Sequence, residues 1–95
     1  DHINTFHIVK SSLRRWQGEF WTMEGGPYSN KNKIFDPTIF VDITDYIDRK
    51  IELISCYDSY FNETILHNIK GLAAYRAQMT KSKYAEAFEC MWRTL

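Results

Sequence analysis

The segment Phe35–Ser59, FDPTIFVDITDYIDRKIELISCYDS, constrains the fold most, because an extended run passes directly into an amphipathic helix. Pro37 keeps the preceding residue out of the helical region, and the β-branched and aromatic residues of Thr38–Asp42 favour a strand. Thr44 is of a type that caps helix N-termini, so we expect a helix from there to about Tyr57. Isoleucines at helical spacing predict its buried face: Ile43, Ile47, Ile51 and Ile54.

Four further segments complete the expected fold. Apolar residues at steps of three and four predict helices over His2–Trp16 and Glu63–Met79. Glu19–Glu24 and Tyr84–Trp92 are typical of strands, with a helix as the alternative for the second. The order predicts an α/β fold of three helices with about three short strands, and so thin a sheet leaves exposed edges. We therefore expect residues 1–95 to be one partial domain, capable of forming a homo-oligomer through these edges.

The composition disfavours several classes of partner. Twelve basic and twelve acidic residues cancel, so no net field attracts nucleic acid or an anionic membrane. The uncharged runs are shorter than a membrane span, and the chain opens with no signal-peptide pattern. The compartment stays undetermined, with the cytoplasm favoured. Cys56 and Cys90 lack the spacing of a zinc knuckle, so we expect buried free thiols.

Three ordered segments resemble the C-terminal part of the PIG-L/LmbE-like family of zinc-dependent N-deacetylases. These segments are Asp1-His2 followed by a helix, the Phe35–Ser59 segment, and YRAQMTKSKYAEAFE, which ends at Glu89. The resemblance covers roughly two-thirds of the chain. It implies the C-terminal portion of a Rossmann-like α/β sandwich, and removal of an acetyl group from an N-acetylglucosamine-type substrate by water activated on zinc.

The resemblance also implies roles for two residues. His2 aligns with the third metal ligand of the family, and Asp1 with the acidic residue that orients a neighbouring catalytic histidine. The N-terminal AHPDD-like motif, which supplies the other metal ligands and the general base, has no counterpart in this sequence. We therefore expect an inactive fragment that does not hold zinc alone, since a catalytic zinc takes three protein ligands. Without the resemblance, a frayed terminal residue is the preferred interpretation of His2.

The expected substrate contacts lie in the loop that follows the expected strand Glu19–Glu24. Gly25 and Gly26 give this loop freedom, and it carries Glu24 and Tyr28 as polar candidates for contact with an N-acetylated amino sugar. Arg76 is expected to form an ion pair near the end of the sheet, with substrate contact as the alternative. A different class of function is also open: the aromatic excess, 16% of residues, suits a noncatalytic sugar-binding or oligomerisation module.

Overall fold

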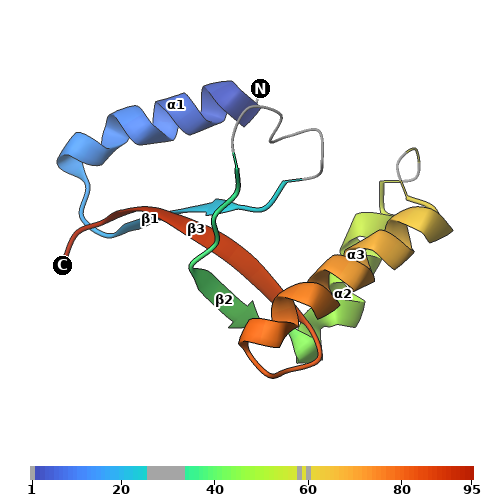
Figure 1. The fold of residues 1–95 in the computed structure, drawn as a ribbon. Coiled ribbons are helices and arrows are strands. Elements are labelled where there is room, and N and C mark those ends of the chain that lie inside the picture. The colour runs from blue at the N-terminus through green and yellow to red at the C-terminus, as the bar shows by residue number, and fades with distance from the viewer. Residues whose placement is uncertain (1, 26–33, 58, 60) are drawn as a thin grey trace.

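A computed structural model of the chain describes residues 2–25, 34–57, 59 and 61–95. The helices are α1 (His2–Ser12), α2 (Ile47–Ser55) and α3 (Glu63–Arg76), and the strands are β1 (Glu19–Met23), β2 (Ile39–Asp42) and β3 (Ala85–Arg93). Three 3-10 turns accompany the helices, at Leu13–Arg15, Thr44–Tyr46 and Ala77–Met79. Figure 1 shows α2 and α3 at the end of the sheet where β3 begins, and α1 above β1.

The strands form one antiparallel sheet in the order β1-β3-β2. The longest strand, β3, is central, and its partners on either side are both edge strands. The α/β class with three helices and three short strands is therefore confirmed for the described residues. The pairing register shifts between Phe20 and Trp21, which marks a bulge where β1 and β3 pair.

Asn62 caps α3 as its residue type predicts, because its side-chain Oδ1 accepts a hydrogen bond from the backbone N–H of Ile65 at 2.9 Å. The expected cap at Thr44 is wrong. The Thr44 hydroxyl donates to Asp42 Oδ1 at 2.6 Å and accepts from the Tyr84 N–H at 3.2 Å. Because that hydroxyl joins the end of β2 to the start of β3, a 3-10 turn precedes α2, which begins only at Ile47.

Asp42 closes the same turn from the other side. Its Oδ1 accepts from the Thr44 hydroxyl and from the Thr44 backbone N–H, the latter at 2.9 Å. These hydrogen bonds favour the carboxylate and hold the pKa of Asp42 below its ordinary value. The turn thereby fixes the point at which the chain leaves the sheet for α2.

The core is small and lies where α2, α3 and the sheet meet. Ile43, Ile47 and Ala73 form its buried centre, and Ile51 and Tyr84 pack against it. The isoleucine face of α2 is confirmed. Two apolar residues of α3 lie outside the core, since Leu72 is 43% and Tyr75 55% exposed. The core ends before it reaches them because α3 makes few contacts beyond α2 and β3.

The sheet carries an apolar face that is partly exposed. Met23, Phe88 and Ile39 stand directly opposite one another across the three strands, so their side chains share a face. Trp21 and Val41 lie two residues along from Met23 and Ile39, and the Trp21 ring is 5.6 Å from that of Phe88. Met23 is 77% exposed, and Trp21 and Val41 are 40% exposed. We call these five residues the apolar sheet face.

The total surface is also large for the size of the chain. The protein exposes 7977 Å², whereas a compact monomer of its mass, 11.3 kDa, exposes about 5,700 Å². Its radius of gyration is 14.9 Å, against about 12 Å for a compact domain of this length. The fold therefore leaves roughly 2,200 Å² open that a compact domain would cover.

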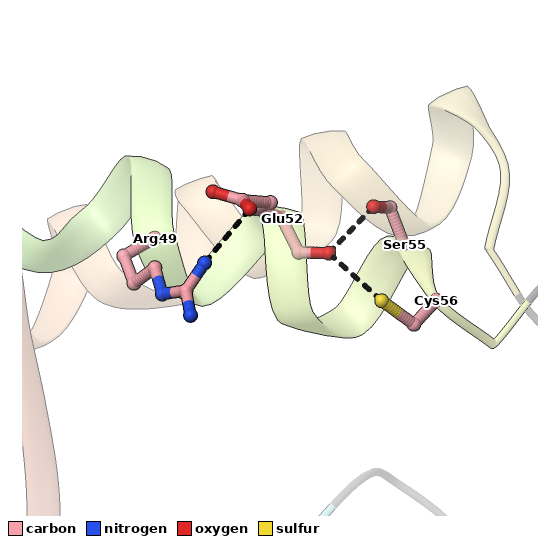
Figure 2. A network of polar contacts seen from close by, with 4 residues as sticks. All are labelled: Arg49, Glu52, Ser55 and Cys56. Carbon is pink, nitrogen blue, oxygen red and sulfur yellow. Dashed lines mark hydrogen bonds and ion pairs between the residues drawn. The ribbon is translucent and has the colours of Figure 1, made fainter.

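The last turn of α2 presents an exposed polar network, shown in Figure 2. Arg49 donates to Glu52 Oε1 at 2.7 Å, and the Ser55 hydroxyl and the Cys56 thiol both donate to the Glu52 backbone carbonyl. Cys56 is exposed and Cys90 is partly buried, and both are free thiols. The expectation of buried thiols is therefore wrong for Cys56, which follows the last residue of α2 and is exposed.

None of the described helices is both long and apolar enough to cross a lipid bilayer.

Candidate functional site

A cavity of about 670 Å³ lies between the sheet and the two packed helices. Most of its wall is apolar and comes from Met23 and Phe88 of the sheet, Ile54 of α2, and Ile69 and Leu72 of α3. This volume falls within the range of small-molecule sites in proteins, which are mostly apolar with a few polar groups. The cavity is therefore the candidate functional site.

The cavity brings together three residues selected from the sequence. His2 lies at its edge at the start of α1, and Glu24 and Gly25 line it where β1 ends. These two chain segments meet because the chain reverses between α1 and β1, so that the start of α1 comes near the end of β1. The other three selected residues, Asp1, Gly26 and Tyr28, lie outside the described residues.

Glu24 is held by Arg76 of α3. Arg76 Nη2 donates to Glu24 Oε1 at 2.6 Å, and Arg76 Nε donates to Oε2 at 3.0 Å. The pair is mostly buried, with Arg76 21% and Glu24 17% exposed. The hydrogen bonds to Glu24 raise the pKa of Arg76 above its ordinary value. The expected ion pair of Arg76 is confirmed, and it engages both carboxylate oxygens of a residue that we expected to contact substrate.

A second ion pair crosses the cavity wall from α2 to β3. Lys50 Nζ lies 2.6 Å from Glu86 Oε1, and the two side chains are 33% and 37% exposed. Sequence analysis missed this pair. Its members are 36 residues apart and lie in two different segments of the chain, so no local signal in the sequence could have identified them as partners.

The described residues do not form a complete zinc site. They contain no group of three or more histidine, cysteine, aspartate or glutamate side chains that could hold a metal ion. His2 is exposed at the cavity edge and can offer one imidazole nitrogen. Since a catalytic zinc takes three protein ligands, His2 alone is too few donors, and the remainder would have to come from other residues.

The aromatic residues do not assemble into one sugar platform among the described residues. Trp21 belongs to the apolar sheet face, whereas Trp92 lines a smaller hollow of about 180 Å³ with Phe6 and Phe20. The Phe6 and Phe20 ring centres are 5.8 Å apart, which is how α1 packs on the sheet. Two of the tryptophans are also substantially exposed, Trp16 at 50% and Trp92 at 45%.

Comparison of the chain with protein-family models, curated proteins and solved structures finds no match in any of the three.

Proposed function

We propose that this chain forms part of a metal-dependent N-deacetylase of the PIG-L/LmbE kind, acting on an N-acetylglucosamine-type amide. The parent fold under this proposal is a Rossmann-like sandwich of which these residues are the C-terminal portion. The observation that supports it is the position of His2, the aligned metal ligand, at the edge of the same cavity as Glu24 and Gly25. Zinc would supply an activated water there, and the His2 imidazole would be one of the zinc ligands.

The charges of the cavity suit a neutral ligand. Lys50 faces Glu86 and Arg76 faces Glu24, each pair at 2.6 Å, so each cation in the wall is matched by a carboxylate. A free anion or cation would have to break one of these pairs to be bound. An acetylated amino sugar is uncharged at its amide, and it can place its acetyl methyl against the apolar part of the wall.

The test is to measure zinc content and N-acetylglucosamine hydrolysis for the protein translated from the complete reading frame. Replacing His2 by Ala should lower zinc occupancy severalfold and abolish hydrolysis, because one of three ligands is lost. His67→Ala is the matched control, since His67 is an exposed histidine of α3 away from the cavity lining. Full zinc retention in His2→Ala would remove His2 from the site, and strong activity of residues 1–95 alone would refute the need for further ligands.

A second candidate function is a noncatalytic sugar-binding or assembly module. The apolar sheet face and the large total surface of the chain favour it, because exposed apolar patches mark interaction sites. Both edge strands of the sheet are short and leave backbone groups for pairing. A monodisperse monomer in sedimentation experiments, together with no heat of binding for amino sugars in calorimetry, would contradict this alternative.

A further inference from the structure

Arg76 contacts two residues that are far from it in the sequence and one neighbour on its own helix. Its fork holds both oxygens of Glu24 at the end of β1, and its guanidinium carbon lies 5.7 Å from the centre of the Phe35 ring. The ring of its neighbour Tyr75 is 5.2 Å away. A bidentate arginine with aromatic rings beside its plane is held in one orientation, because the fork and the stacking restrict different rotations.

The surroundings of the two residues indicate which of them is fixed and which is restrained by the ion pair. The residue separation between Glu24 and Arg76 is 52, and α3 is anchored in the core through Ala73, one turn before Arg76. Among the described residues, the end of β1 is held less firmly, since Met23 is 77% exposed and pairs with Phe88 of β3 on one side of the strand. The fixed arginine therefore holds the carboxylate, and through it the end of the strand.

We propose that Arg76 is a positioning residue of the cavity, which fixes Glu24 and Gly25 at the wall that they share with His2. The importance of this wall for substrate rests on the proposed function, but the positioning itself does not. It also reassigns Glu24: with both oxygens engaged by Arg76, this carboxylate serves the shape of the cavity rather than contact with substrate.

The test is the backbone order parameter of Glu24 and Gly25, measured by ¹⁵N relaxation on this chain. We expect values near about 0.85 in the wild type, falling below about 0.6 in Arg76→Lys, since lysine keeps the charge but not the fork. The amides of α3 and β3 should keep their wild-type values. Glu24→Gln, which keeps the shape of the side chain, should give the same local loss, and the exchanged pair Glu24→Arg with Arg76→Glu should restore part of it.

Lys50→Gln is the matched control, because it breaks the other ion pair of the same cavity and should leave Glu24 and Gly25 rigid. Unchanged order parameters in Arg76→Lys, or an equal loss throughout the sheet, would overturn the positioning role. No metal or substrate enters this measurement, so it is decided independently of the deacetylase proposal. In the complete protein, a raised KM with unchanged kcat in Arg76→Lys would then link positioning to substrate binding.

Discussion

Met23→Lys tests whether the apolar sheet face is an interaction surface. Met23 is 77% exposed on the edge strand of this face, two residues from Trp21 on its own strand and opposite Phe88 on the central strand. Burying a methionine side chain completely stabilises by about 1.5–3 kcal/mol, so covering the exposed three-quarters would contribute roughly 1.5 kcal/mol per chain. Lysine removes this contribution and adds a charge that must be desolvated.

If the face associates, the substitution should weaken self-association at least about tenfold in dissociation constant, since 1.4 kcal/mol corresponds to a factor of ten. Sedimentation velocity over a range of chain concentrations measures this directly. The stability of the folded chain should change by less than about 0.5 kcal/mol, because an exposed side chain contributes little to folding. Urea denaturation at low protein concentration separates the two effects.

Met79→Lys provides the matched control. Met79 is 68% exposed, has the same side chain, and lies in the 3-10 turn after α3 rather than on the sheet face. It should leave association unchanged. Equal weakening by the two substitutions would show that general hydrophobicity, and not this face, drives association. A wild-type chain that stays monomeric at all concentrations would refute the interaction surface altogether.

Two further predictions concern the core and the turn before α2. Ile47→Ala should lower the free energy of unfolding by about 3 kcal/mol, because Ile47 is 6% exposed, whereas Leu53→Ala on the same helix, 53% exposed, should lower it by less than about 1 kcal/mol. Urea denaturation compares them, and equal losses would contradict the assigned core. The depressed pKa of Asp42 should stabilise the fold at pH values above the ordinary pKa of aspartate, and this stabilisation should disappear as the pH falls below about 4. Asp42→Asn keeps the acceptor but cannot titrate, so an identical acid dependence of the urea midpoint in wild type and variant would contradict it.

The sequence predicts the elements of this fold better than their ends and their surroundings. Local signals are sufficient for α3, whose cap at Asn62 is correct, and for the isoleucine face of α2, because helical spacing selects one side of a helix. They fail at Thr44, whose hydroxyl is used by a contact with Tyr84 across 40 residues. The same limit applies at the site. The sequence predicts that Arg76 forms an ion pair, but no pattern could specify Glu24 as its partner.

The two proposed functions involve the same surface of the protein. Met23 and Phe88 belong to the apolar sheet face, and both also line the cavity whose edge carries His2. A protein segment that covered this face would therefore close the cavity as well, and it could bring the metal donors that the described residues lack. Under this view, the open surface and the incomplete donor set have one physical cause. Met23→Lys in the complete protein should then weaken the packing of that segment on the apolar sheet face and lower zinc occupancy and hydrolysis as well. Met79→Lys should leave all three unchanged. If the segment no longer packs on the apolar sheet face but zinc is retained, this face and the zinc site are separate, and only the assembly function is supported.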